Sequence, residues 1–192
     1  MSNYKTVFFI LGILQIILGI FMGVPMIVQL LYGEFDSSFI ISSIITLIFG
    51  ILFLISNLDY ENKIDLHQAF LITSLSWMTV AIFGALPFFF SNLNLTFTDA
   101  FFESMSGITT TGSTIIINLE NAPKGILIWR AILQWLGGIG IIVMAITLMP
   151  LMNVGGMLLF KVLNSDSSNE VLPSSKEISI KLILIYIVLT FG

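Results

Sequence analysis

The 192-residue sequence contains no cysteine, a single histidine and few charged residues, which make up 9% of the chain. The absence of cysteine excludes disulfide bridges and thiolate metal sites. Soluble domains carry about 25% charged residues, so this chain has too little polar material to cover a soluble fold. The formal net charge of −4 is spread over short loops, and no basic run indicates binding to nucleic acid.

Hydrophobic residues, by contrast, make up 57% of the sequence, and the mean hydropathy is +1.05. They form blocks long enough to cross a lipid bilayer, which requires roughly 20 residues. The sequence therefore predicts an all-α, polytopic membrane protein. The first apolar block is longer than the ~7–15 residues of a signal-peptide core and leads into another span, which favours a retained helix.

The apolar blocks predict four complete spans and the start of a fifth. We place them at about Val7–Tyr32, Phe39–Ile55, Gln68–Phe90, from near Gly125 past Phe160, and at Ile178–Gly192. We expect Pro25 to kink the first span, which neighbouring helices tolerate in a membrane. We also expect Gly137–Gly140, Pro150 and the glycine pair at 155–156 to break or bend the fourth span.

The segment Ser91–Lys124 is too polar and too interrupted to span a membrane, but Thr96–Ile108 within it predicts a short amphipathic helix. Thr96 followed three residues later by Asp99 resembles a capping box, and we interpret Asp99 as a helix cap rather than as a cation attractor. A helix of about 12 residues is ~18 Å long, roughly half a bilayer. A half-length helix followed by polar residues, between two spans, is typical of a re-entrant loop.

The residues that follow this half-helix, Thr109–Ser113, read TTTGS. Non-helical backbone at membrane depth is tolerated only where it is buried in protein or lines water. Free carbonyls can replace the hydration shell of a monovalent cation, and Gly112 can adopt the positive φ that turns carbonyls toward one axis. Neutral oxygens suit potassium or sodium, whereas calcium prefers carboxylates. The alternative is a Thr/Gly-rich surface loop after an amphipathic helix.

Two charged residues near this segment have alternative interpretations. Glu103 either attracts cations at a pore mouth or anchors the loop by hydrogen bonds. Arg130, with Gln134 one turn later, either shapes the pore entrance or pairs with Glu103; the interpretation we favour is an arginine that extends to the membrane interface.

Glycines and serines of the chain also have a functional and a structural interpretation. Gly137–Gly140 is either a gating hinge or a site of close helix packing. Intramembrane serine chemistry would need a base near Ser104, Ser106 or Ser113, but His67 is the single histidine. We therefore expect no enzyme.

Several stretches, in order, resemble one family. DAFFESMSGITTTGST (Asp99–Thr114) resembles the first pore loop of the Trk/Ktr/HKT potassium transporters in their bacterial TrkH/TrkG form. GALPFFFS (Gly84–Ser91) is similar to the end of the first pore-lining helix. RAILQWLGGIGIIVMAI (Arg130–Ile146) and LMNVGGMLLFKV (Leu151–Val162) are similar to the second. The resemblance covers essentially the whole chain.

The resemblance implies four helix–pore loop–helix repeats in one subunit, each supplying a quarter of a selectivity filter. It implies uptake of potassium, and in some members sodium, without a cofactor, by a dimeric subunit with a cytosolic nucleotide-binding regulatory partner. Thr109, Thr110, Thr111 and Gly112 are then the first filter segment, with potassium at Thr110 and Thr111. Ser113, Glu103 and Arg130 are then residues of the pore mouth or its support.

The same resemblance divides the chain into an N-terminal hairpin at 1–62, repeat one at 63–165 and the start of repeat two at 166–192. Within repeat one the pore helix is 96–108 and the filter is 109–113. Lys181–Gly192 is ~18 Å of helix against a ~30 Å core, so we expect a truncated chain. The alternatives are a non-conducting fragment and a homotetrameric, channel-like subunit.

Lysine placement predicts the orientation in a bacterial inner membrane. With the N-terminus in the cytoplasm, five lysines lie inside, and Lys124 and Arg130 lie outside; the five are Lys5, Lys63, Lys161, Lys176 and Lys181. The re-entrant loop then enters from the extracytoplasmic face.

Overall fold

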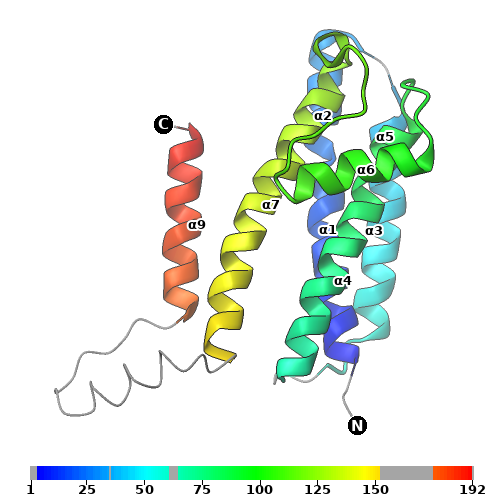
Figure 1. Ribbon diagram of the computed structural model, residues 1–192. Coiled ribbons are helices and arrows are strands. Elements are labelled where there is room, and N and C mark those ends of the chain that lie inside the picture. Colours follow the sequence, from blue (N-terminus) through cyan, green and yellow to red (C-terminus); the bar gives the residue numbers. More distant parts are fainter. Residues whose placement is uncertain (1–3, 35, 61–64, 152–174, 192) are drawn as a thin grey trace, which may run out of the picture. The chain divides into compact units, whose positions relative to one another are not determined.

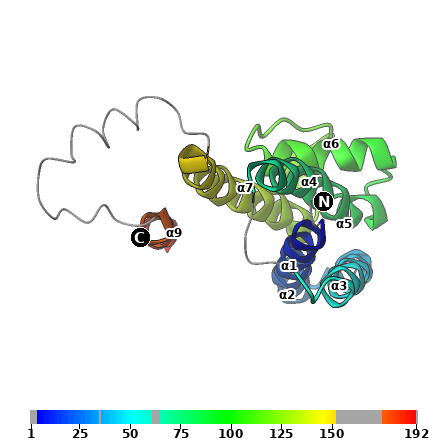
Figure 2. The same cartoon turned by 90° about the horizontal axis from the view of Figure 1, so that it is seen from below.

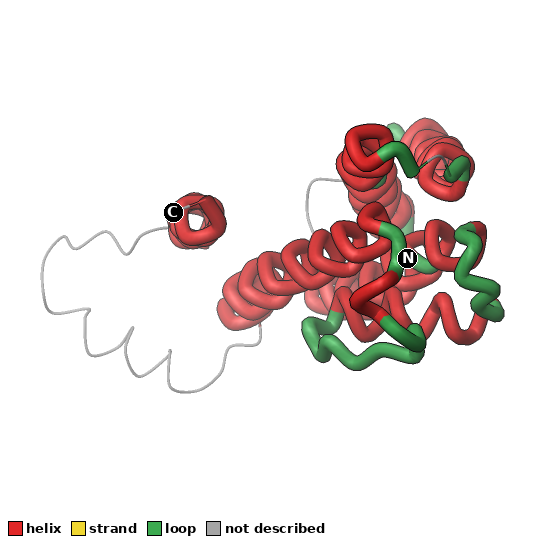
Figure 3. The backbone as a smooth tube through the Cα atoms, turned by 90° about the horizontal axis from the view of Figure 1, so that it is seen from above, coloured by secondary structure: helices red, strands yellow, loops and turns green. Residues whose placement is uncertain are grey.

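The computed structural model describes residues 4–34, 36–60, 65–151 and 175–191, and over these ranges it contains helices and loops but no strands (Figure 3). The chain forms two compact units, Met1–Gly138 and Ile139–Gly192. Four helical stretches are long and apolar enough to cross a membrane: Lys5–Tyr32, Ser38–Ile55, His67–Phe90 and Lys124–Ile142. The predicted all-α membrane fold is thus confirmed.

The N-terminal hairpin consists of α1 (Lys5–Phe21), α2 (Gly23–Tyr32) and α3 (Ser38–Ser56). The first span is divided at Met22 into α1 and α2. Pro25 lacks the N–H that would bond the carbonyl of Phe21, one turn earlier, so the helix is interrupted where the sequence predicts a kink. α1 and α3 approach closely, because a Cβ on Gly12 would lie 2.9 Å from the carbonyl oxygen of Gly50.

The third span consists of α4 (Leu66–Gly84) and the short α5 (Leu86–Phe90). α4 begins with a capping box, in which Gln68 N donates to Asp65 Oδ1 at 2.6 Å and Asp65 N donates to Gln68 Oε1 at 3.2 Å. The two helices meet at Ala85, just before Pro87. Together they match the predicted span Gln68–Phe90.

The predicted half-helix is α6 (Phe97–Ile108), and Figure 1 shows it running across α4 rather than along it. Figure 2 shows the same region along the helix axes, with α1 beside α3 and with α4, α5 and α6 together on another side. A loop containing the one-turn helix η1 (Leu119–Asn121) leads from α6 to α7 (Lys124–Leu151). A short helix therefore lies between the third and fourth spans in the chain, as the sequence predicts.

The fourth span was predicted to break or bend. The break is wrong over the described residues, because α7 continues through Gly137–Gly140 and Pro150, and the bend stays a prediction. A glycine inside a helix costs only about 1 kcal/mol, and a membrane penalises open backbone hydrogen bonds more strongly. The remainder of the predicted span, to Phe160, lies outside the described residues, as does the loop at 166–174. In the second unit, α9 (Ser175–Phe191) covers most of the predicted run Ile178–Gly192.

The core of the first unit surrounds Trp129 of α7, which is fully buried. Its buried members come from both arms of the hairpin, from α5, α6 and the following loop, and from α7: Leu18, Met22, Phe39, Ala85, Phe88, Ala100, Ile116, Ala122, Ile126, Trp129 and Leu133. The indole N–H of Trp129 donates to the carbonyl oxygen of Gly84 at 2.9 Å. The first half of α7 is therefore packed between the hairpin and the pore-loop elements.

Candidate functional site

The half-helix α6 is fixed at its N-terminus by the predicted capping box. Asp99 N donates to Thr96 Oγ1 at 3.2 Å, and Thr96 N and Oγ1 donate to Asp99 Oδ2 at 3.1 and 2.6 Å. The carboxylate of Asp99 is thus engaged at the helix start, where it also complements the positive end of the helix dipole. This geometry corresponds to the cap interpretation of Asp99.

The C-terminus of α6 ends in a Schellman motif centred on Thr110. Thr110 N donates to Gly107 O at 2.9 Å and Thr111 N to Ser106 O at 3.0 Å, which are the two bonds that define the motif. Thr110 has φ of +58°, a conformation in which a β-branched residue is a genuine outlier. The helix end therefore imposes a left-handed backbone on a residue whose type disfavours it.

The backbone N–H groups of the TTTG segment all bond back to α6. Thr109 N donates to Met105 O at 3.0 Å, and Gly112 N donates to Ser106 O at 3.3 Å, in addition to the two bonds of the Schellman motif. The carbonyl oxygens of Thr109, Thr110 and Thr111 accept no hydrogen bond from any described residue. The N–H groups of the segment are thus bonded to the end of α6, whereas the carbonyl oxygens of its three threonines remain available.

Gly112 also has a left-handed backbone, with φ of +78°, as its residue type predicts. Left-handed φ values at 110 and 112 alternate with φ of −80° at Thr109 and with a non-positive φ at Thr111. In an ordinary strand consecutive carbonyls point to opposite sides, whereas an alternation of backbone handedness turns them toward a common side. Residues 109–115 are exposed in this chain.

Side-chain hydroxyl groups form further hydrogen bonds along the segment. Thr109 Oγ1 donates to Met105 O at 2.8 Å and lies 2.8 Å from Thr111 Oγ1. Ser106 Oγ donates to Ser113 O at 2.7 Å. The carbonyl of Ser113 is thereby occupied, so Ser113 serves to shape the loop.

Glu103 lies beneath the loop with its side chain fully buried. Its Oε1 accepts hydrogen bonds from Thr114 Oγ1 at 2.7 Å, from Ile115 N and from Ile116 N at 3.3 Å. One carboxylate oxygen therefore fixes the backbone that follows Thr109–Ser113. Between the two interpretations of Glu103, the structure shows the hydrogen-bond anchor.

Arg130 does not extend to the surface of the molecule, so the interpretation favoured from the sequence is wrong. It is 8% exposed and forms a buried ion pair, Arg130 Nη1 with Glu103 Oε2. Its Nη2 also approaches the carbonyl oxygen of Gly112 at 3.4 Å. A charge this far from water needs a partner, and α6 supplies one 27 residues earlier in the chain.

One glycine of α7, Gly137, packs against the C-terminal end of α6. A Cβ on Gly137 would lie 1.8 Å from the carbonyl oxygen of Ile108, the last residue of α6. A Cβ on Gly107 would lie 3.0 Å from Leu133 Cβ. Gly137 therefore lets α7 approach the helix end directly, which corresponds to the packing alternative at this position, whereas a Cβ on Gly140 would meet no atom within 4 Å.

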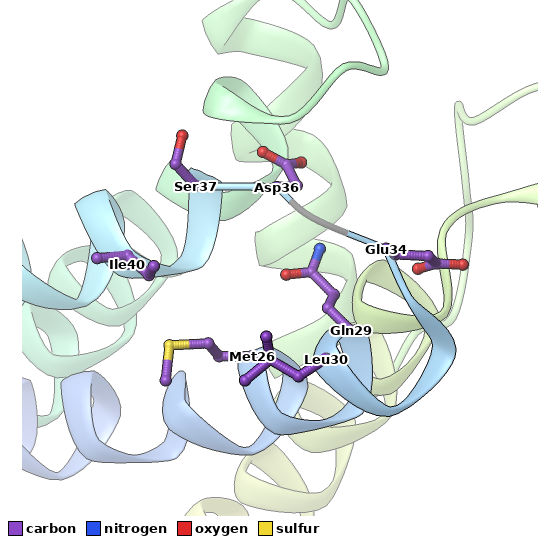
Figure 4. A pocket seen from close by; sticks show the side chains of 7 residues that line it. All are labelled: Met26, Gln29, Leu30, Glu34, Asp36, Ser37 and Ile40. Carbon is purple, nitrogen blue, oxygen red and sulfur yellow. The ribbon is translucent and has the colours of Figure 1, made fainter.

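These contacts define what the segment can do chemically. It offers neutral backbone oxygens, and no cluster of three or more His, Cys, Asp or Glu occurs among the residues whose placement is described. Neutral oxygens match monovalent cations, and the backbone N–H groups of Thr109–Gly112 are already bonded to α6. A cavity of about 310 Å³ lies elsewhere, at the α2–α3 turn, where Gln29, Glu34 and Asp36 contribute to its lining (Figure 4).

Sequence reasoning missed three members of this site. Ser106 was considered only as a candidate nucleophile, yet its carbonyl and hydroxyl both bind the loop. Thr114, which bonds Glu103 through its hydroxyl, and Ile116, which bonds it through its backbone N–H, were not singled out. A backbone N–H gives no signal in residue type. The available signal was the charge pair itself, since two opposite charges in apolar surroundings are expected to meet.

Comparison with known proteins identifies the class to which this fold and site belong. A family model described as TrkH, cation transport protein, matches residues 36–191. The chain belongs to this family. The relatives are named as transport proteins, which agrees with the expectation of a transporter rather than an enzyme.

Individual relatives match over nearly the whole chain. It is 41% identical to the Trk system potassium uptake protein TrkI of Halomonas elongata, over 92% of this chain and 36% of that protein. It is 38% identical to the Trk system potassium uptake protein TrkH of Escherichia coli, over 98% and 40% respectively. The crystal structure of the potassium transporter TrkH from Vibrio parahaemolyticus superposes with a TM-score of 0.80 at 33% identity, covering 99% of this chain and 38% of that one. The chain thus spans less than half the length of these relatives.

Proposed function

We propose that this chain forms part of a membrane subunit for potassium uptake, and that Thr109–Gly112 is one segment of its selectivity filter. The observation that carries the proposal is the division of backbone groups at the end of α6. Four consecutive N–H groups bond to the helix end, while the carbonyls of Thr109, Thr110 and Thr111 accept no bond from the described residues. Family membership supports transport of a cation.

In this proposal a potassium ion sheds water and is held by the carbonyl oxygens of Thr110–Gly112, together with equivalent segments of further repeats. The C-terminal end of α6 adds a partial negative charge of about half an electron. Glu103 and Arg130 do not touch the ion. Glu103 holds the residues after the filter in place, and Arg130 holds Glu103 and contacts the carbonyl oxygen of Gly112 at 3.4 Å, so that the carbonyls keep their positions as ions pass.

The wider organisation is proposed on the same basis. Residues 1–62 form a hairpin, 63–165 one helix–pore loop–helix repeat, and 166–192 a cytoplasmic loop with the start of the next repeat. The protein lies in a bacterial inner membrane with its N-terminus in the cytoplasm. In the complete assembly the subunit forms a homodimer and binds a cytosolic nucleotide-binding regulatory subunit.

The proposal is tested by complementation in a bacterium that lacks potassium uptake systems. The chain is expressed alone, and also as a chimera in which it replaces the matching part of Escherichia coli TrkH. We expect growth at limiting potassium with the chimera, and loss of that growth when Gly112 is replaced by valine. A chimera that is present in the membrane but never supports growth would contradict the proposal.

The chain expressed alone separates the alternative architectures. Growth with the chain alone would indicate that it self-assembles a filter as a homotetramer. Growth with the chimera only would indicate that the segment functions as one part of a larger filter, as proposed.

A further inference from the structure

The turn after α2 reaches the first residue of α7, 90 positions later in the chain. Lys124 N donates to Glu34 Oε2 at 2.9 Å, and Lys124 begins α7. The first four N–H groups of a helix have no partner within it, and a carboxylate there also complements the helix dipole. Figure 4 shows Glu34 extending away from Asp36 and Ser37. Glu34 therefore caps α7 from a different part of the chain.

A second contact joins the hairpin to the same helical turn. A Cβ on Gly125 would lie 2.6 Å from Gln29 Cγ and 2.9 Å from Gln29 Cδ. Gln29 is 2% exposed, and its Nε2 has no hydrogen-bond partner in the described part of the chain. Its side chain is thus held by packing against Gly125. Any larger residue at 125 would have to displace it.

Further along α7, the hairpin also packs against the residue that precedes Arg130. The ring of Trp129 lies edge-on to Phe39 of α3, with centroids 6.2 Å apart and planes at 78°. The same indole donates to the carbonyl of Gly84 at the end of α4. α7 is therefore held between the hairpin and α4 at the point where Arg130 turns toward Glu103.

We propose that the N-terminal hairpin is a positioning element for the filter. Glu34 and Gln29 fix the first turn of α7, α7 places Arg130 against Glu103, and Glu103 holds the N–H groups of residues 115 and 116. This inference rests on the proposed function of Thr109–Gly112 as an ion-binding segment. It assigns to the hairpin a role in ion selection although none of its residues reaches the filter.

The first test measures amide hydrogen exchange of the chain in lipid nanodiscs. In Glu34→Ala and Glu34→Gln we expect exchange about fivefold faster, as for loss of a helix cap, both in the first turn of α7 and at Ile115 and Ile116. Glu34→Asp should retain most of the protection. The matched control is Asp36→Asn, because Asp36 Oδ1 accepts from Ser38 N and caps α3 instead.

The second test uses the packing contact. Gly125→Ala should accelerate exchange at Ile115 and Ile116, and adding Gln29→Ala should restore protection, because it removes the atoms that the new methyl group meets. If exchange in the Glu34 variants or in the Gly125 variants changed only in the first turn of α7, the proposal would be overturned. Glu34 would then be a local cap of α7.

Transport by the chimera distinguishes this inference from the proposed function. Glu34→Gln should raise the KM for potassium and lower the ratio of rubidium to sodium uptake, with Glu34→Asp close to the parent. A merely structural role would reduce the amount of protein in the membrane without changing KM or this ratio, and that result would overturn the inference. Transport that is insensitive to Gly112→Val would instead contradict the proposed function, while the exchange result at Ile115 and Ile116 would still decide the inference.

Discussion

Replacing Glu103 by glutamine removes one charge and keeps the volume of the side chain. The carboxylate it replaces has two separate tasks. Oε1 accepts hydrogen bonds from Thr114, Ile115 and Ile116, while Oε2 pairs with Arg130. Glutamine has one acceptor and one donor group, so whichever way the amide is oriented, its NH₂ faces donors on one side.

The expected magnitude follows from the burial of the pair. Removal of one partner of a buried ion pair costs about 3–5 kcal/mol, since the other charge remains desolvated. The glutamine oxygen retains some of the bonds, so we expect a loss near the lower limit, about 3 kcal/mol. Because each 1.4 kcal/mol is a factor of ten, the N–H groups of Ile115 and Ile116 should open on the order of 10²-fold more often.

Amide hydrogen exchange in lipid nanodiscs measures this opening directly, and potassium uptake by the chimera reports its effect on transport. Glu120→Gln is the matched control, because Glu120 is exposed in η1. The double variant Glu103→Gln, Arg130→Gln contains no buried charge. Its loss should therefore be smaller than the sum of the two single losses by about 1–3 kcal/mol.

The reasoning would be refuted if Glu103→Gln changed exchange at Ile115 and Ile116 less than about twofold. Additive losses in the double variant would equally show that the two charges are not coupled. Either result would mean that the loop holds its shape without the carboxylate.

Three further changes test other parts of the site. Gly112→Val places a β-branched residue at φ of +78°, a cost of about 1–2 kcal/mol, and should abolish selective potassium uptake in the chimera while the protein remains in the membrane. Gly137→Ala drives a methyl group into the carbonyl of Ile108 and should lower the thermal midpoint of the purified chain; Gly23→Ala, which meets no atom within 4 Å, should leave it unchanged. Thr96→Ala removes the cap of α6 and should cost about 1 kcal/mol, seen as faster exchange in the first turn of that helix with little change at its C-terminus; equal acceleration at both ends would contradict independent caps.

The spans and the half-helix were predictable because their signals are local. α3, at Ser38–Ser56, differs from the predicted Phe39–Ile55 by one residue at each end, since an uninterrupted apolar block has only one way to satisfy its backbone in a bilayer. α6 begins where Thr96 and Asp99 predict. The kink of the first span follows in the same way from Pro25.

The positions of charges were not predictable from neighbouring residues. An arginine close to the start of a span is ordinarily interfacial, and only the spatial position of Glu103 makes burial of Arg130 favourable. The bond from Lys124 to Glu34 crosses 90 residues and has no local signal at all. The continuity of α7 was missed for a related reason, because the glycines at 137–140 meet the conditions for a break, whereas Gly137 permits close packing against Ile108.

The proposed filter segment contains two residues with a left-handed backbone, Thr110 and Gly112. The sequence predicted this conformation at Gly112 but not at Thr110. At Gly112 the N–H bond to Ser106 is long, 3.3 Å, so the residue itself must supply the conformation, and glycine does so at no steric cost. At Thr110 two Schellman bonds near 3.0 Å, each worth about 1 kcal/mol, offset a penalty of about 1–2 kcal/mol for a left-handed threonine. Those bonds consume the donors and so leave the carbonyls of Thr109, Thr110 and Thr111 available. The geometry that ends the helix is therefore the same geometry that leaves the proposed ion ligands unbonded. A change that relaxes the backbone at Thr110 would also alter the positions of these carbonyls.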